Sequence, residues 1–387
     1  MKVQPTVLGQ LLQLFPREEF DRIVRKYKGD HKTHKLDCWT QFVSLFYAQL
    51  RSRTSLRDIE IGLEAQVNKL YHLGMIQPIK RSTLSDANAK RDYRIYEESF
   101  QVLLKRCQRL GKHTFAFNHP LRILDSTFIS LCHTLFPWAT YRQKKGGLKL
   151  HLYYDQDNDL PEFITITEGK ESDLKHGRRM PIKPDSILVF DRGYRDYTWL
   201  NKLNEQGSIF VTRTHSLFTY TKIGQLASDE ADVLSDDLVC MPAKHSHHKR
   251  LYTAPIRLIR YRDPLSGQVF EFITNQLEWS ALTIAKIYQH RWKIELFFKW
   301  IKQHFKIKTF VGTSKNAVLT QIWIAMITYL ILWYTKRQTS YPRPLHTLTR
   351  LLNEVALERL HLLDILRLST IEIPSILPNH QLDLTFS

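Results

Sequence analysis

The sequence has few cysteines, and those it has lie far apart. There are four, Cys38, Cys107, Cys132 and Cys240, and no two of them form a CxxC pair. This spacing supports neither a cysteine-ligated zinc site nor a disulfide framework, and it fits a reducing compartment. The N-terminal residues also lack the unbroken apolar segment and the cleavage site of a signal peptide. We therefore expect a cytoplasmic protein.

Acidic residues are also in short supply relative to basic ones. The 387 residues include 56 Lys and Arg against 38 Asp and Glu, which gives a formal net charge of +18. A charge of this sign and size favours a polyanionic partner, either nucleic acid or an anionic membrane surface. The apolar fraction of 43% is sufficient for a packed globular core and argues against global disorder.

One apolar run is long enough to resemble a membrane span. It covers residues 317–334 and follows directly after a strongly basic segment. Thr320, Gln321 and Thr328 interrupt the apolar sequence. We therefore interpret the run as a buried core helix and expect no membrane partner.

The residue pattern changes along the chain and predicts an α/β fold with helical ends. The first 118 residues contain amphipathic stretches, whereas β-rich runs begin at residue 121. We predict five parts: a helical, DNA-binding N-terminal domain at 1–118, a first part of a catalytic core at 119–213, a mostly β insertion at 214–275, a second part of the core at 276–335 and a helical C-terminal region at 336–387.

Several local features within these parts can be predicted as well. Ser55 is a candidate start of one helix, and Ser82 of another that runs on through Arg91 and Arg94. Two helices separated by a turn, the second opening with basic residues, would suit a helix-turn-helix on DNA, with a pair of core helices as the alternative. Residues 229–237 read as an acidic loop in the insertion.

Two aspartates lie at predicted strands of the core. Asp125 is embedded in the apolar run 123–127, and Asp191 closes the buried-type strand 187–190. An ionised carboxylate in a buried strand is costly unless a cation accompanies it. Each aspartate is therefore predicted either to form a salt bridge with Arg or Lys or to bind a metal ion.

A third carboxylate lies alone among cations. Residues 286–308 carry seven Lys or Arg and a single acid, Glu295. On a helix at about 100° per residue, Tyr288, Arg291, Glu295 and Lys302 fall within about 60° of one another. The same alternatives apply to Glu295, because Arg291 lies one turn away. If the three carboxylates meet, they could hold two Mg²⁺ ions, which prefer hard oxygen ligands and which together catalyse phosphoryl transfer.

Other apparent motifs for metal or nucleobase binding are better interpreted as ordinary structural features. Residues 155–159 imitate the start of a calcium loop, but Leu160 and Ile166 occupy the expected Gly and Glu positions, so a hairpin turn is the better interpretation. Trp279 and Trp292 are candidates for stacking on a nucleobase. We interpret both as buried core residues.

The four residues of the basic segment match a known spacing. Tyr288, Arg291, Glu295 and Lys302 fit the pattern Y-(x2)-R-(x3)-E-(x6)-K of the insertion-sequence-four family of bacterial DDE transposases. Two further segments, Asp125-Ser126-Thr127 and Asp191-Arg192-Gly193-Tyr194, resemble the first and second acidic boxes of that family. The resemblance covers roughly residues 121–310 and gives no residue-level role to the N-terminal part.

The resemblance implies a fold and a set of site residues. The fold would be a ribonuclease-H-like mixed sheet, with a mostly β insertion before the catalytic helix. The catalytic, metal-binding triad would be Asp125, Asp191 and Glu295, binding two Mg²⁺ ions that Mn²⁺ can replace. DNA phosphates beside the scissile bond would contact the remaining three motif residues, Tyr288, Arg291 and Lys302.

The resemblance also implies an activity and partners. The protein would cut the terminal inverted repeats of its own element and join them to target DNA, without a covalent protein intermediate. It would act on double-stranded DNA as a homodimer and be associated with the bacterial nucleoid. Two alternatives are a nuclease of the same fold that does not join strands, and a catalytically silent DNA-binding protein descended from a transposase.

Overall fold

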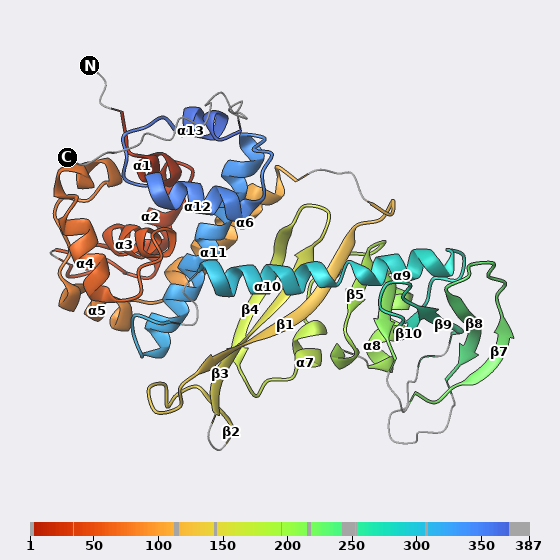
Figure 1. Cartoon of the computed structure of the whole chain (residues 1–387). Coiled ribbons are helices and arrows are strands. Elements are labelled where there is room, and N and C mark those ends of the chain that lie inside the picture. The colour runs from red at the N-terminus through yellow and green to blue at the C-terminus, as the bar shows by residue number, and fades with distance from the viewer. Residues whose placement is uncertain are drawn as a thin grey trace, which may run out of the picture.

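The computed structural model consists of one long mixed sheet with a helical body at one end (Figure 1). It describes residues 4–33, 35–111, 116–142, 145–194, 196–214, 218–241, 252, 254–305 and 309–370. The strands are β1 Leu121–Leu131, β2 Thr140–Arg142, β3 Lys145–Asp155, β4 Leu160–Glu168, β5 Ile187–Phe190, β6 Ile209–Arg213, β7 Thr221–Gln225, β8 Val233–Cys240, β9 Ile256–Arg262 and β10 Val269–Thr274.

The helices gather mainly at the two ends of the sequence. They are α1 Val7–Leu12, α2 Arg17–Lys26, α3 Cys38–Leu50, α4 Leu56–Glu64, α5 Arg81–Lys90, α6 Arg94–Gln108, α7 Asp173–Gly177, α8 Tyr197–Glu205, α9 Ala281–Gln289, α10 Trp292–His304, α11 Lys315–Gln338, α12 Leu345–Val355 and α13 Leu362–Leu368. Two short 3₁₀ helices, η1 Val67–Leu73 and η2 Arg192–Tyr194, complete the described elements.

The sheet contains the arrangement expected of a ribonuclease-H-like core. Strand β3 pairs antiparallel with both β1 and β4, while β5 is parallel to β1 and β6 is parallel to β5. Helices α9 and α10 cross one side of this sheet, as Figure 1 shows. The mixed sheet with helical N- and C-terminal regions confirms the predicted fold class.

The insertion extends the core sheet instead of forming a separate one. Strand β10 pairs antiparallel with β6, and β9, β8 and β7 follow in that order. The predicted acidic loop at 229–237 is wrong from residue 233 onward, because strand β8 begins there. Its acids are neutralised inside the sheet: Asp236 pairs with Arg257, and Asp237 with Lys222. Local acidity was therefore a poor guide to a loop.

Helix α11 is the centre of the helical body. It is long and apolar enough to cross a membrane, yet its 18-residue apolar window is completely buried inside the protein. It packs against α3, α5 and α6 from the N-terminal part and against α12 from the C-terminal part. The prediction of a buried core helix is confirmed, and the two helical ends of the chain share one hydrophobic core.

The N-terminal helices differ from the prediction at one boundary. Ser55 caps α4 as expected, with its hydroxyl accepting the Asp58 N–H at 3.1 Å. The helix predicted from Ser82 through Arg94 is wrong: α5 ends at Lys90, and α6 begins anew at Arg94. Sixteen residues, 65–80, including η1, separate α4 from α5. This connection is too long for a helix-turn-helix, so that prediction is wrong as well.

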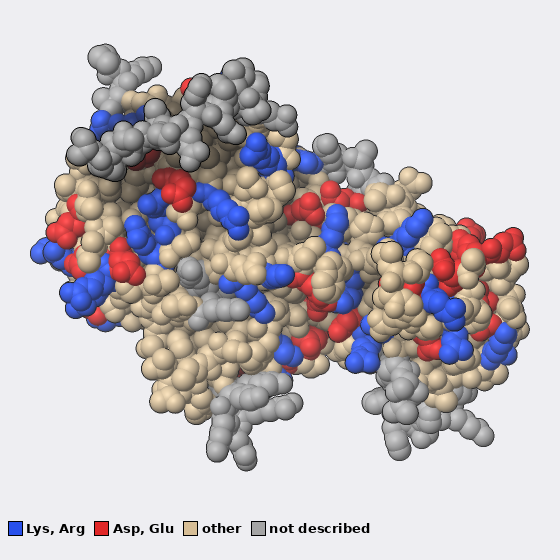
Figure 2. Space-filling model, viewed as in Figure 1, with Lys and Arg blue, Asp and Glu red and all other residues tan. Residues whose placement is uncertain are grey.

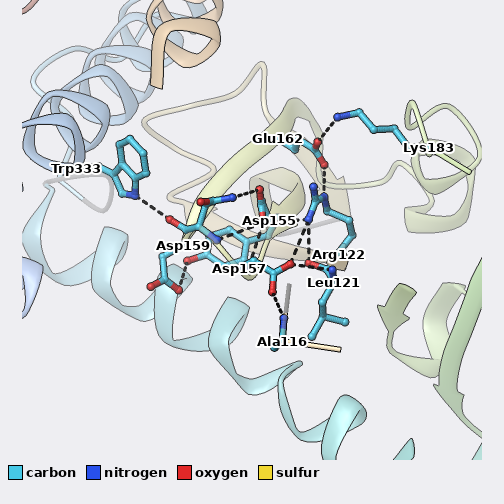
Figure 3. A network of polar contacts seen from close by, with 11 residues as sticks. Ala116, Leu121, Arg122, Asp155, Asp157, Asp159, Glu162, Lys183 and Trp333 are labelled. Atoms are coloured by element: carbon cyan, nitrogen blue, oxygen red, sulfur yellow. Dashed lines mark hydrogen bonds and ion pairs between the residues drawn. The ribbon is translucent and has the colours of Figure 1, made fainter. Parts of the chain in front are cut away.

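The β3–β4 turn confirms the predicted hairpin and is fastened to the start of β1. Figure 3 shows the buried Arg122 side chain surrounded by acids from β3, the turn and β4. Its guanidinium lies 3.0 Å from Asp155, 3.7 Å from Asp157 and 2.6 Å from Glu162. Lys183 adds a second cation at 2.8 Å from Glu162. This network fixes the hairpin against the strand that carries Asp125.

We predict that Arg122→Met destabilises the fold strongly. The substitution keeps an unbranched side chain but leaves three carboxylates without their shared cation, and breaking a buried pair in this way costs about 3–5 kcal/mol. Urea denaturation followed by circular dichroism measures the loss. Arg22→Ala is the matched control, because its ion pair with Glu18 is solvent-exposed and should contribute less than about 1 kcal/mol. Equal effects of the two substitutions would contradict this role.

Candidate active site

The register of the parallel strands brings the two predicted aspartates together. Leu124 of β1 pairs with Phe190 of β5. The next residue along the chain is Asp125 within β1 and Asp191 just after the end of β5, so the two aspartates lie side by side. Asp125 is largely buried, with 14% of its side chain exposed, whereas Asp191 is partly exposed at the start of η2.

Backbone groups hold both carboxylates. The N–H of Ser126 donates to Oδ1 of Asp125 at 2.7 Å, and the N–H of Gly193 donates to Oδ1 of Asp191 at 2.8 Å. Each bond involves a residue of the acidic box that follows the aspartate. A hydrogen bond from an N–H group stabilises the ionised form of a carboxylate.

The third carboxylate arrives on α10, but the helix before it is not continuous. The prediction that Tyr288 to Lys302 share one continuous helix is wrong, because α9 ends at Gln289 and α10 begins at Trp292. Between them the chain tightens into i→i+3 bonds, with the Arg291 N–H donating to the Tyr288 carbonyl at 2.9 Å. Glu295 still lies in the first turn of α10 and faces the cavity at the aspartates.

An arginine connects the helix carboxylate to the strand carboxylate. Arg291 places Nη1 3.3 Å from Oδ2 of Asp125 and donates from Nη2 to Oε1 of Glu295. Its Nε is buried without a hydrogen-bond partner. The salt bridge considered as the alternative for Glu295 is therefore present. Arg291 is the local counter-ion of two of the three carboxylates.

The balance of charge at Asp125 is nevertheless unfavourable to its ionised form. The pKa of Asp125 is raised to about 7, chiefly by burial, with the negative charges of Asp191 and Glu295 acting in the same direction and the Ser126 N–H and Arg291 opposing them. The strand carboxylate thus lies where additional positive charge would stabilise it. A hard divalent cation fits this environment, since carboxylate oxygens are its preferred ligands.

All six predicted site residues line one cavity of about 680 Å³. Tyr288 is nearly buried and packs its ring 4.9 Å from that of Phe272. Lys302 donates to Oγ1 of Thr127 at 2.5 Å. The complete lining is Asp125, Ser126, Thr127, Asp191, Arg192, Arg213, Tyr288, Arg291, Glu295, Phe298, Lys299, Lys302 and Gln303. Figure 2 shows basic and acidic side chains intermingled over the middle of the molecule, where α10 crosses the sheet.

Three cations of the cavity were missed by sequence reasoning. Arg192 belongs to the second acidic box, and Lys299 lies one turn after Glu295, so both had a local signal. Arg213 had none. It lies at the end of β6, next to Asp191 in register because Phe190 pairs with Thr212. Trp292, predicted to be buried, is 59% exposed beside the site.

The carboxylates are not arranged around a metal position in this conformation. No group of three or more His, Cys, Asp or Glu side chains in the described ranges is placed to hold a metal ion. Arg291 instead binds both Asp125 and Glu295 through its guanidinium. The donor set fits a divalent cation, but the cation requires Arg291 to release these oxygens.

Comparisons with known proteins agree with this chemistry. Residues 116–331 match the transposase DDE domain, and residues 3–76 match a domain of unknown function. The chain is 32% identical over 280 residues to y4zB of Sinorhizobium fredii, a protein named as a transposase, covering 71% of this chain and 77% of that protein.

A second relative extends the similarity to most of the chain. It is named as the transposase for insertion sequence element IS5377 of Geobacillus stearothermophilus, and it is 31% identical over 342 residues, or 87% of each protein. These matches confirm the resemblance carried by the two acidic boxes and by the spacing from Tyr288 to Lys302. The chain belongs to the family of DDE transposases encoded by insertion sequences, DNA-binding enzymes whose DDE domains use divalent metal ions.

Proposed function

We propose that this transposase cuts the terminal inverted repeats of its element and joins them to target DNA by a cut-and-paste route. One observation carries the proposal: Asp125, Asp191 and Glu295 converge on a single cavity that five Lys and Arg side chains also line. Carboxylates suit divalent metal ions and cations suit phosphates, so the cavity has the two components that phosphodiester chemistry needs.

We propose the three carboxylates as the catalytic residues and as the ligands of two Mg²⁺ ions, which Mn²⁺ can replace. When bound, such a pair of ions activates the attacking oxygen and stabilises the leaving one. Asp125 and Asp191 provide ligands from two adjacent strands, and Glu295 provides one from α10. The raised pKa of Asp125 supports this assignment, because a bound cation would favour its ionised form.

The cations of the cavity are proposed to orient the DNA strand. Tyr288, Arg291 and Lys302 would contact phosphates beside the scissile bond, and Arg213 extends this row of donors across β6. Arg291 would exchange its bonds to Asp125 and Glu295 for bonds to a phosphate. The planar guanidinium matches the spacing of the oxygens in both a carboxylate and a phosphate, so this exchange needs little reorganisation of the Arg291 side chain.

The reaction has two chemical stages. Water first breaks a phosphodiester bond at the element end, leaving a 3′-hydroxyl and a 5′-phosphate. That hydroxyl then attacks a phosphorus in the opposite strand or in target DNA, and the displaced oxygen leaves as the new 3′-hydroxyl. Two ends must be processed, and we therefore propose that a homodimer holds them, one per active site.

We propose that the five sequence regions divide this work. Residues 119–213 and 276–335 carry the chemistry, and residues 214–275 widen the sheet beside it. Residues 1–118 would bind DNA away from the scissile bond, and the C-terminal region 336–387 would support them, with α12 packed against α11. Association with the nucleoid would follow from DNA binding.

Strand transfer distinguishes this proposal from a nuclease of the same fold. We expect the protein, with labelled element ends, a target plasmid and Mg²⁺, to give joined products as well as cleaved ends. Asp125→Asn, Asp191→Asn and Glu295→Gln should each reduce both products to background and leave end binding within about threefold of the wild type. Cleavage without joining would favour the nuclease, and near-normal cleavage by any of the three variants would remove that residue from the site.

Removal of Arg291 should expose the metal site in the absence of DNA. We expect Arg291→Gln to bind Mn²⁺ more tightly than the wild type, by roughly tenfold as is typical of coupled sites, because two carboxylates lose their internal counter-ion. Electron paramagnetic resonance of free Mn²⁺ measures the affinity. Lys299→Gln is the control, since Lys299 lines the same cavity. Unchanged or weaker binding by the Arg291 variant would show that the arginine does not compete with the metal.

Lys302 should contribute to DNA affinity without regard to sequence. If it contacts a phosphate, Lys302→Ala lowers the affinity for all duplexes and reduces the slope of log K against log salt by about 1. Filter binding at several salt concentrations measures this slope. Lys202→Ala on α8 is the control and should leave the slope unchanged. An identical salt dependence for both variants would show that Lys302 does not contact the phosphate backbone.

A further inference from the structure

On the opposite face of the sheet from α10, a polar cluster lies directly beneath Asp125. Successive side chains of a strand point to opposite faces, so the Ser126 hydroxyl and the Asp125 carboxylate lie on opposite faces of the sheet, although Ser126 also contributes to the cavity lining. The Ser126 hydroxyl donates to Oδ1 of Asp173 at 2.7 Å. Asp173 is the first residue of α7, and the same Ser126 supplies the N–H that holds Oδ1 of Asp125.

Asp173 is itself held firmly. Lys149 of β3 lies 3.2 Å from each of its carboxylate oxygens, and its ammonium also donates to the Glu171 carbonyl at 3.0 Å. The completely buried His151, opposite Ser126 in the β1–β3 register, places Nδ1 3.5 Å from Asp173. The carboxylate that receives the Ser126 hydroxyl therefore cannot turn away without breaking an ion pair.

Helix α7 also contacts the second acidic box. Its last residue, Gly177, approaches so closely that a Cβ atom there would lie 2.9 Å from Cδ1 of Tyr194 and 3.2 Å from Cδ2 of Leu124. Leu124 immediately precedes Asp125, and Tyr194 ends the η2 turn that Asp191 opens. One short helix thus touches the residues on both sides of Asp125 and the turn that follows Asp191.

We propose that Asp173, with Lys149 as its counter-ion, is a positioning residue that fixes Asp125 through Ser126 and sets its separation from Asp191 through α7. This inference rests on the proposed metal-binding role of the two aspartates. A pair of metal ions tolerates little change in ligand separation, and residues that orient ligands typically contribute 10–100-fold to metal affinity or activity. Neither Asp173 nor Lys149 lines the cavity, so both act only through Ser126 and α7.

The test uses Ser126→Ala and Asp173→Ala in the full-length chain. Glu171→Ala is the matched control: Glu171 lies in the same connection and pairs with Lys175, but its side chain contacts neither Ser126 nor Lys149 in the described interactions. Mn²⁺ binding to the protein bound to an element end is titrated by electron paramagnetic resonance, and cleavage of the pre-bound end is followed against Mn²⁺ concentration. Asp125→Asn gives the baseline for a lost ligand.

We expect both alanine variants to bind end DNA normally, to need roughly 10–100-fold more Mn²⁺ for binding and for half-maximal cleavage, and to recover at high Mn²⁺. Ser126→Thr, which keeps the hydroxyl, should restore the wild-type requirement. A Mn²⁺ requirement within about threefold of the wild type in both variants, or an equal change in Glu171→Ala, would overturn the proposal. If Asp125→Asn binds Mn²⁺ and cleaves like the wild type, the proposed active site itself is wrong, which is a separate result.

Discussion

In the middle of the sheet, Leu124, Phe190 and Thr212 lie side by side on three parallel strands. The backbone hydrogen bonds that set this register also bring together the residues that follow along the chain: Asp125, Asp191 and Arg213. A slip of one residue would turn each of these side chains to the opposite face. The apolar residues preceding them resist such a slip, because they are packed on both faces. The charge pattern of the site is therefore a consequence of hydrophobic packing within the sheet.

Once the register has placed two acids together, their charge has to be compensated. The protein does so with Arg291, which reaches both Asp125 and Glu295 from the junction of α9 and α10. This ion pairing stabilises the fold when no ligand is bound. It can also be reversed, because a phosphate can compete for the guanidinium and so free the carboxylates to bind a cation. A ligand that frees the carboxylates must favour cation binding, and the cation must favour that ligand by the same factor. Element DNA and divalent metal are thereby expected to bind cooperatively.

Sequence reasoning reached the features that depend on local pattern. Runs of apolar residues correctly predicted the strand around Asp125, the strand before Asp191 and the burial of α11. It failed where tertiary contacts decide. The break between α9 and α10 at Arg291 keeps helical backbone angles, and no Pro or Gly marks it in the sequence. Strand β8 contains two acids, which are compatible with a strand only because Arg257 and Lys222 pair with them.

Residues that function through register were equally hidden. Arg213 lies 22 positions after Asp191 in sequence, and no spacing rule connects it with the site until β5 and β6 are paired. Asp173 is one acid among several in a charged connection, and its contact with Ser126 follows from the path of α7. The family spacing from Tyr288 to Lys302 located one wall of the cavity. The two acidic boxes located the aspartates of the opposite wall, but Arg213 could be placed there only once β5 and β6 were paired.

Helix α11 explains how the two walls stay in position relative to each other. On one side its Tyr329 ring packs 5.0 Å from Phe297 of α10, the helix that carries Glu295. The hydroxyl of the same tyrosine donates to the Asp159 carbonyl in the β3–β4 turn at 2.6 Å. That turn is tied by Arg122 to the start of β1, the strand that leads to Asp125 (Figure 3). Because the N-terminal helices pack on α11 as well, a displacement of these helices would reach both carboxylates through this one element. The buried helix thus connects the N-terminal helices with both walls of the active site.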